Sequence, residues 1–456
     1  MEFTVGSLLT DIAIASAFIF IAKFLREKVK ILQKLFIPAS LLAGFLGLLL
    51  GNNGFGLIHF SEQLGSYSGI LIIVVFVTIG IRGFNFSKGG LKKNFERIGA
   101  YYCFRNVGWA GQYSLPIIFG LFVLPLFAPN LNPNFGMLIP AGFQGGHGTS
   151  AALGETLSAL GWTDATDLAM TTATIGLMAG IFGGILMINI ATKKGYTSYV
   201  KKFGELPEEM KTGVISPEKR EDMGKETISS IALDPLAWHL ALVAIPAGIG
   251  YVLTNFISEK TGLGVPAFSV GFLVAILFSY LLKKTKIDYT IDKKVISRIG
   301  GTATDFLVFF GIASIKVPVV LEYIVPFALL MLFGILWTAF HFWVLGPRMM
   351  QKDWFEKGIY VYGYSTGVTA IGLSLLRIVD PNNESTTLDE TAIVTPIESI
   401  IEIFALAFLP GLIASGKWYI GIIPILIYGI VLFLLPIIGK LWYKGSKKAE
   451  ERKNLI

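Results

Sequence analysis

Two segments of the chain combine an apolar composition with a break rich in glycine, serine and threonine. Residues 137–157 read GMLIPAGFQGGHGTSAALGET, and residues 358–380 read GIYVYGYSTGVTAIGLSLLRIVD. A broken helix exposes backbone N–H and C=O groups that an intact helix would use internally. Helix N-termini at a break attract a carboxylate, and free carbonyl and hydroxyl oxygens can bind Na⁺. The two segments therefore predict a site for an anionic small solute and a hard cation.

The candidate site residues are the glycines and polar residues of these breaks and a few ionisable or hydroxyl residues elsewhere. Predicted substrate-binding residues are Gln144, Gly146, His147, Gly148, Thr149, Ser150, Ser365, Thr366, Gly367 and Thr369. Predicted ion-binding residues are Thr149, Thr172, Thr366, Asp305, Glu398 and Glu402. The carboxylates are included because ionisable residues within apolar spans are functional candidates by default.

Close helix packing is the alternative explanation for the glycines. We prefer it for Gly176, Gly180 and Gly184, which recur every four residues on one helical face. Arg105 and Arg377 could bind a substrate carboxylate, pair with a neighbouring acid or extend to a membrane interface, and we favour the last two. His239 and His341 are expected to be packing or interfacial residues. A single His147 makes no metal site, so no metal other than sodium and no cofactor is expected.

The sequence argues against an enzyme. GYSTG at 363–367 matches the G-x-S-x-G pattern, but that motif needs an Asp and then a His later in the chain. The last histidine, His341, precedes Ser365. There is no H-E-x-x-H motif, no P-loop and no cysteine pair, because Cys103 is the only cysteine.

The elements that must position these residues are membrane helices. The 456-residue chain is 53% hydrophobic and 15% charged, with a mean hydropathy of +0.66, which excludes a water-exposed globule. Apolar runs of spanning length predict eleven crossings. They lie near 8–23, 35–50, 67–82, 97–127, 168–192, 236–256, 264–283, 298–315, 319–346, 392–414 and 418–440.

The positions of Lys and Arg predict the orientation of the chain. Basic residues cluster at 23–34, 82–97, 283–298 and 348–357 and in the tail from Lys440, whereas 51–66, 128–136 and 154–167 have none. The positive-inside rule then places the N-terminus outside and the tail in the cytoplasm. The net charge of +7 is explained in the same way and does not indicate nucleic-acid binding. The polar segment 193–230 is predicted to be a cytoplasmic linker, with too few apolar residues for a domain of its own.

The two halves of the chain resemble each other. IPASLLAGFLGLLL from Ile37 resembles VPAFSVGFLVAIL from Val265, with Pro38 matching Pro266; FVTIGI around Gly80 resembles VFFGIA around Gly311; GFQGG resembles GYSTG. Five crossings per half make the second copy inverted, and inverted repeats with paired broken helices are typical of secondary transporters.

The predicted fold is therefore an all-α polytopic membrane protein with two inverted repeats of five transmembrane helices. Each repeat carries one re-entrant hairpin. Residues 1–192 form the first repeat with its hairpin at about 137–157, and 231–415 form the second with its hairpin at about 358–380. Residues 416–456 add one helix and a basic cytoplasmic tail.

One stretch carries a resemblance to a known family. GGHGT at 145–149, followed by Ala151 and Ala152, and ATDLAM at 165–170 resemble the bacterial sodium/glutamate symporter family, as do FVTIGI at 76–81 and IPASLLAG at 37–44. The resemblance covers roughly residues 1–414. It implies Na⁺-coupled uptake of glutamate across the inner membrane by a multi-pass homodimer in which a mobile transport domain moves past a scaffold domain.

Several functions remain as alternatives. A symporter coupled to Na⁺ or H⁺ could take another carboxylate or amino acid. A channel would conduct without saturable, Na⁺-dependent accumulation. A membrane sensor would need a signalling domain, and the segment 193–230 is too short to suggest one.

Overall fold

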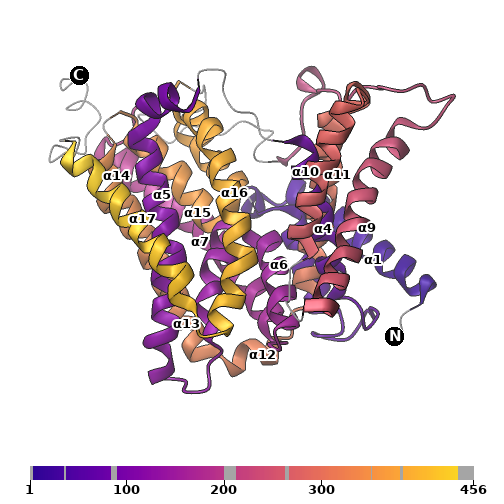
Figure 1. Ribbon diagram of the computed structural model, residues 1–456, viewed down its shortest axis with the longest axis horizontal. Coiled ribbons are helices and arrows are strands. Elements are labelled where there is room, and N and C mark those ends of the chain that lie inside the picture. The colour runs from indigo at the N-terminus through magenta and orange to yellow at the C-terminus, as the bar shows by residue number, and fades with distance from the viewer. Residues whose placement is uncertain are drawn as a thin grey trace. The chain divides into compact units, whose positions relative to one another are not determined.

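The computed structural model describes residues 4–34, 37–83, 90–199, 212–261, 267–350, 352–380 and 384–439. Every regular element within these ranges is a helix (Figure 1). Among the described residues, nine helices are long and apolar enough to cross a membrane. The protein is therefore an all-helical, multi-pass membrane protein. The predicted match at Pro266, the middle of the linker and the basic tail lie outside the described residues.

A helix occupies each of the eleven regions in which a crossing is expected. The helices are α1 (Val5–Lys28), α3 (Ala39–Leu50), α4 (Ser66–Arg82), α5 (Gly90–Phe122), α7 (Ala165–Lys194), α9 (Pro235–Thr261), α10 (Ala267–Lys284), α11 (Lys293–Ala313), α13 (Ile324–Phe340), α16 (Thr387–Ala414) and α17 (Trp418–Ile438). Two of them, α3 and α4, are apolar but too short to be counted among the nine, whereas α13 is continued by further helical turns as far as Met349. The two glycine-rich segments form helices that are interrupted by a break, and they are described below.

The chain divides into two compact units, and each takes segments from both halves of the sequence. Unit 1 comprises 1–84, 147–170 and 208–317, and unit 2 comprises 85–146, 171–207 and 318–456. Unit 1 thus holds α1, α3 and α4 together with α9, α10 and α11. Unit 2 holds α5 and most of α7 together with α13, α16 and α17. This division interleaves the two halves of the sequence.

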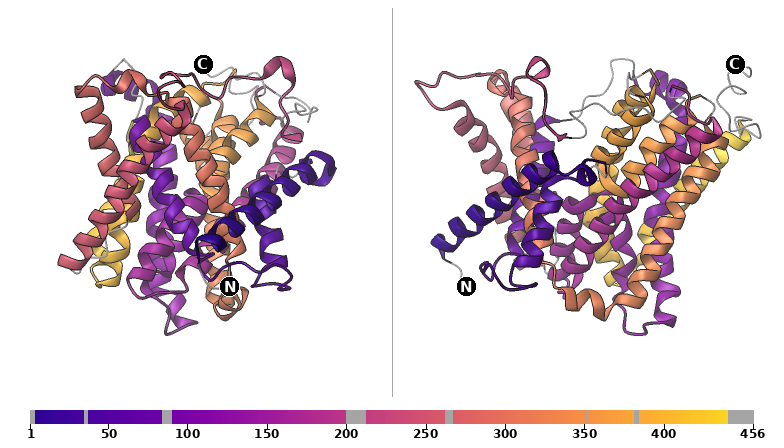
Figure 2. Two further views of the ribbon diagram at one scale, coloured as in Figure 1. Left: turned by 90° about the vertical axis from the view of Figure 1, so that its right-hand side faces the viewer. Right: turned by 180° about the vertical axis from the view of Figure 1, so that it is seen from behind.

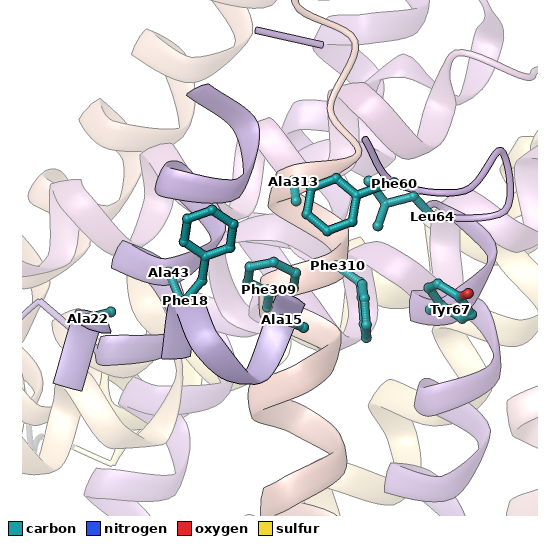
Figure 3. Close-up of a cluster of buried hydrophobic side chains, with 10 residues drawn as sticks. All are labelled: Ala15, Phe18, Ala22, Ala43, Phe60, Leu64, Tyr67, Phe309, Phe310 and Ala313. Atoms are coloured by element: carbon teal, nitrogen blue, oxygen red, sulfur yellow. The ribbon is translucent and has the colours of Figure 1, made fainter. Parts of the chain in front are cut away.

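Unit 1 is built around the pair α4 and α11. Helix α3 packs on α11 and α10 packs on α4, while α1 packs on α3 and α9 on α10. Glycines permit the close approaches: a Cβ on Gly44 would lie 2.8 Å from Ile312, and one on Gly80 would lie 2.8 Å from Ala275. Aromatic rings fill the space between α1, α3, α4 and α11, where Phe309 and Phe310 lie at the centre of a buried cluster (Figure 3).

A buried carboxylate fixes α1 within unit 1. Asp11 accepts hydrogen bonds from the Ser61 backbone N–H at 3.1 Å, the Ser61 hydroxyl at 2.5 Å and the Tyr67 hydroxyl at 2.7 Å. Because all three residues are buried, these bonds hold α1 against the loop that precedes α4. A buried charge is tolerated only with such partners.

Unit 2 is built around α5. Helices α13 and α17 both pack along it, and α16 packs against α17 and α5, so that these helices run side by side (Figures 1 and 2). The short helix η2 (Pro133–Met137) also packs on α5, where a Cβ on Gly136 would lie 2.3 Å from the Pro116 carbonyl oxygen. The proline within α5 leaves its spanning length intact.

The described end of the predicted linker, from residue 212, packs on the start of α11. The Asp292 carboxylate accepts from the backbone N–H of Lys225 at 2.8 Å, and the Thr227 hydroxyl donates to the Thr290 carbonyl at 2.6 Å. Asp292 is also the N-cap of α11, accepting from the N–H groups of Lys294 and Val295. The side chain therefore joins the linker to a membrane helix.

We expect Asp292→Ala to lower the free energy of unfolding by about 1 kcal/mol at neutral pH, the usual cost of losing an N-cap. Partial burial alone would raise the pKa of Asp292, but the backbone donors of Lys225, Val295 and Lys294 outweigh it and lower the pKa. The carboxylate thus stabilises the fold above its unfolded pKa of about 3.9, and the contribution disappears as the pH falls through the lower folded value. Thermal unfolding in detergent should show a wild-type advantage that shrinks only at strongly acidic pH; an advantage independent of pH would contradict this role.

Candidate functional site

The second glycine-rich segment is a helical hairpin. It forms α15 (Trp354–Val379), which is interrupted at Gly367 (φ −150°, ψ 33°) and Val368 (φ 67°, ψ 171°). A Cβ on Gly363 would lie 2.8 Å from the Cα of Gly372, nine residues later. In a continuous helix nine residues span about 13 Å, so the chain reverses at the break. We call residues 365–369 the second tip.

Val368 holds a backbone conformation that a branched residue rarely adopts. Its φ and ψ lie in a region populated almost only by glycine, which costs of order 1–3 kcal/mol. Such strain persists where the surrounding structure fixes it, and it clusters at ligand sites. The strained residue therefore marks the second tip as a functional candidate.

The first glycine-rich segment breaks at one sharp turn. A π-helix, η3 (Pro140–Gln144), ends at Gly145, and Gly146 has a φ of +65° before α6 (Gly146–Ala159) continues. A Cβ on Gly146 would lie 2.3 Å from Cγ1 of Val368. The two breaks therefore meet within unit 2, although 222 residues separate Gly146 from Val368 in the chain.

The broken backbone is shorter than the sequence suggests. His147, Gly148, Thr149 and Ser150 already belong to the first turn of α6, and the chain passes from unit 2 to unit 1 between Gly146 and His147. A helix N-terminus needs only one left-handed glycine before it, so the following residues can be helical. The positive end of the α6 dipole therefore lies at the break.

Helix α7 lies against the second tip along its glycine face. A Cβ on Gly176 would lie 2.6 Å from the Thr366 carbonyl oxygen, one on Gly180 2.7 Å from its hydroxyl, and one on Gly184 2.4 Å from Leu375. These glycines allow close packing, as the four-residue spacing predicts. On the same helix, buried Thr172 lies against Gly142, which precedes the first break.

We expect Gly176→Ala to impair the second tip more than Gly180→Ala. The added methyl at 176 meets a backbone oxygen, whereas at 180 it meets the Thr366 hydroxyl, which can turn away at the cost of its hydrogen bond to the Tyr362 carbonyl. Overpacking of this kind costs about 1–3 kcal/mol. Thermal unfolding and ligand-dependent stabilisation of the two purified variants should rank in that order; equal behaviour would show that the Thr366 carbonyl is free to move.

Two buried glutamine side chains donate hydrogen bonds at or next to the second tip, and their amide oxygens accept none from any residue that the structure describes. The Gln112 Nε2 donates to the Ser365 carbonyl at 2.8 Å, and the Gln144 Nε2 donates to the Tyr364 hydroxyl at 3.2 Å. The Oε1 atoms of both glutamines are buried and have no hydrogen-bond partner among the described residues. Buried amide oxygens without donors are suitable ligands for a cation.

A buried ion pair lies next to Tyr364, the residue that precedes the second tip. The Arg105 Nε of α5 is 2.6 Å from the Glu398 Oε2 of α16, and the two side chains are only 1% and 2% exposed. The guanidinium lies over the rings of Tyr364 and Tyr360, at 4.3 and 5.9 Å from their centroids. Its Nη1 and Nη2 form no hydrogen bond with any described residue. Arg105 is thus paired with an acid, one of the alternatives left by the sequence.

Helix α17 reaches the same pair through a short chain of hydrogen bonds. The Asn106 Nδ2 donates to the Glu398 Oε1 at 3.1 Å, the Tyr428 hydroxyl donates to the Asn106 Oδ1 at 3.1 Å, and the Tyr428 and Tyr102 hydroxyls lie 2.7 Å apart. The extra C-terminal helix therefore helps to orient Glu398.

The predicted site residues are spread over both units. Unit 2 contains Gln144, Gly146, Thr172, Ser365, Thr366, Gly367, Thr369, Glu398 and Glu402, and unit 1 contains His147, Gly148, Thr149, Ser150 and Asp305. Within unit 2, Ser365 and Thr366 are buried and Thr369 is exposed. Asp305 of α11 and Arg377 near the end of α15 are exposed too. Neither exposed charge belongs to the buried cluster around Glu398.

The sequence analysis missed Gln112, Asn106, Tyr360 and Tyr364. A polar amide within an apolar span is a signal that could have found the first two, since such residues must be paired inside a membrane. The tyrosines stand four residues apart in α15 and gave no such signal. Among the described residues, no group of three or more His, Cys, Asp or Glu could hold a metal ion.

Comparison with known proteins agrees with these features. A family model described as sodium/glutamate symporter matches residues 5–372. The sodium/glutamate symporter of Escherichia coli (strain K12) is 22% identical over 381 residues, covering 81% of this chain and 88% of that protein, and that of Shigella flexneri matches equally well. The family match ends before α16 and α17, so Glu398 and Glu402 lie beyond it.

Proposed function

The chain belongs to the sodium/glutamate symporter family, and from that premise we propose that it imports glutamate together with Na⁺. The symporters of this family are transporters rather than enzymes. The observation that best supports the proposal is the meeting of the two helix breaks, where Gly146 lies against Val368 within unit 2. Transporters of this general kind bind their solute near the membrane midplane, where broken helices meet.

The polar groups at the breaks suit the two ligands. The positive end of the α6 dipole, which lies at Gly146 in unit 2, can attract a carboxylate of glutamate. Oxygen atoms of Thr366, Gln112 and Gln144 can coordinate Na⁺. Thr172, on the adjacent face of α7, is a further proposed sodium ligand. Gly146, Ser365, Gly367 and Thr369 complete the proposed binding segments of unit 2, and His147, Gly148, Thr149 and Ser150 remain proposed binding residues of unit 1. No covalent step is required.

We further propose that the fold is an inverted repeat. In order along the chain, α1 corresponds to α9, α3 to α10, α4 to α11 and α5 to α13. The first hairpin then corresponds to the second, and α7 to α16. The packing in unit 1 supports this, because α3 on α11 is the counterpart of α10 on α4. The assignment of matching helices to the same unit supports it as well. Repeats of this kind permit alternating access, for which we propose an elevator movement of one unit.

The proposed setting is the inner membrane of a bacterium, with the N-terminus outside, the tail in the cytoplasm and two copies forming a dimer. The basic clusters support the orientation. The membrane potential then adds about 2.3 kcal/mol per 100 mV for each net positive charge imported.

The proposal is tested by reconstituting the full-length protein in liposomes and measuring uptake of labelled glutamate. An inward Na⁺ gradient should drive saturable accumulation, and replacing Na⁺ by K⁺ should abolish it. In parallel samples, unlabelled aspartate or a dicarboxylate is added as a competitor. Weaker inhibition by these compounds than by unlabelled glutamate would identify glutamate as the preferred solute. Uptake that does not depend on Na⁺ for any acidic solute would contradict the proposal.

A further inference from the structure

Two acids and one base lie together next to the second tip: Glu398 and Arg105 are buried, and Glu402 is half-buried. Glu398 and Glu402 stand one turn apart on α16, and Arg105 is bound to Glu398 at 2.6 Å. The Asn106 amide occupies the other oxygen of Glu398. Glu398 and Arg105 therefore neutralise each other, and Glu402 has to be balanced by something else.

The groups that face Glu402 supply no second cation. Within the described residues, the charged or titratable groups acting on it are Glu398 of its own helix, Arg105 and Tyr113 of α5, and Tyr364 of α15. Groups that face Glu398 are Tyr101 and Tyr102 of α5, Tyr360 of α15 and Tyr428 of α17. Among these described groups only Arg105 is positively charged. Glu402 shares a side-chain hydrogen bond with Tyr364, and its Oε1 is buried without a hydrogen-bond partner in the described part of the chain.

Charge balance then limits the state of Glu402. An ionised carboxylate in a membrane span without a cation is too costly to persist, so it must bind a cation or a proton. Sodium needs several oxygen ligands around it. Of the titratable groups that face this carboxyl, Glu398 is already bound by Arg105 and Asn106, which leaves the phenols of Tyr113 and Tyr364. A proton needs one oxygen atom and no further ligands.

We propose that Glu402 is a proton-binding site and that the protein imports one proton together with each solute. The inference rests on the proposed function and adds a second coupling ion to it. Glu402 lies in unit 2, as does the second tip, so a unit that carries the solute carries this proton with it. Tyr364 adjoins Glu402 and accepts the Gln144 hydrogen bond, which links the proton site to the segment before the first break.

The test uses the full-length protein in liposomes that contain a pH-sensitive dye. With Na⁺ equal on both sides, an acidic exterior should drive glutamate accumulation by wild type, and the lumen should acidify in step with uptake. In Glu402→Gln, which resembles a permanently protonated Glu402, this net accumulation should fall at least tenfold. Exchange of internal for external glutamate should continue, because exchange keeps the proton bound.

Two further variants serve as controls. Glu402→Asp keeps a titratable group and should retain part of the acid-driven accumulation. Glu322→Gln removes an exposed acid at the end of α12 (Val317–Glu322) and should behave as wild type. Wild-type uptake that is Na⁺-driven but moves no protons, or that alkalinises the lumen, would overturn the proton site and leave the proposed function intact. Absence of Na⁺-driven uptake would instead overturn the proposed function.

Discussion

Gly146→Val is expected to abolish transport. The residue has a φ of +65°, which costs a non-glycine residue about 1–2 kcal/mol, and its Cβ would lie 2.3 Å from Cγ1 of Val368. A branched side chain there would force the two breaks apart and displace the polar groups on both. Na⁺-driven uptake in liposomes should fall to the level of protein-free vesicles, while the detergent-solubilised protein still unfolds cooperatively.

Two substitutions with smaller side chains test the contact between the breaks. Gly146→Ala should reduce uptake strongly, and Val368→Ala in the same chain should restore part of it by removing the methyl that clashes. Val368→Ala alone should also raise thermal stability slightly, because it lessens crowding in a strained conformation. Equal uptake by Gly146→Ala with and without the second change would show that the breaks do not meet in the working protein.

Removing either partner of the buried ion pair between α5 and α16 should destabilise the protein strongly. Glu398→Gln or Arg105→Met leaves the other charge buried without its partner, and breaking such a pair typically costs about 3–5 kcal/mol. Asn106 and the tyrosine rings cannot replace the missing charge. Thermal unfolding of the purified variants in detergent measures the loss.

The double variant Arg105→Met/Glu398→Met provides the control. Because it leaves no uncompensated charge at this position, it should be less destabilised than the sum of the two single changes. Additive losses would show that the two side chains do not interact. Glu390→Gln tests a second buried pair, with Lys357 at 2.8 Å, and should be destabilising without altering proton coupling.

The sequence was sufficient for the helices and for the position of the breaks. Spans follow from apolar runs of sufficient length, and glycines such as Gly146 and Gly367 stand where a helix must turn. The pairing of distant segments could not be derived in the same way. Nothing local indicates that Gly146 meets Val368, because that contact is set by how helices from both halves pack within unit 2.

For the site, too, the sequence indicated which residues are candidates but not which residues they contact. Polar residues near the breaks were identifiable from their composition, and so were the acids of α16. The contacts of these residues were not identifiable. The sequence does not indicate that Gln112 reaches the Ser365 carbonyl, and it left three alternative roles for Arg105, which the packing of α5 against α16 resolves in favour of an ion pair. The number of unwound residues was overestimated, because α6 begins at Gly146 itself.

The central claim is that solute and Na⁺ cross the membrane together through one pair of helix breaks. Radiolabelled sodium and glutamate fluxes measured in the same liposomes test it most directly. The account predicts that each flux requires the other ligand, that their ratio is constant across glutamate concentrations, and that Gly146→Val removes both. A sodium flux that continues without glutamate, or a glutamate flux that continues without sodium, would contradict it.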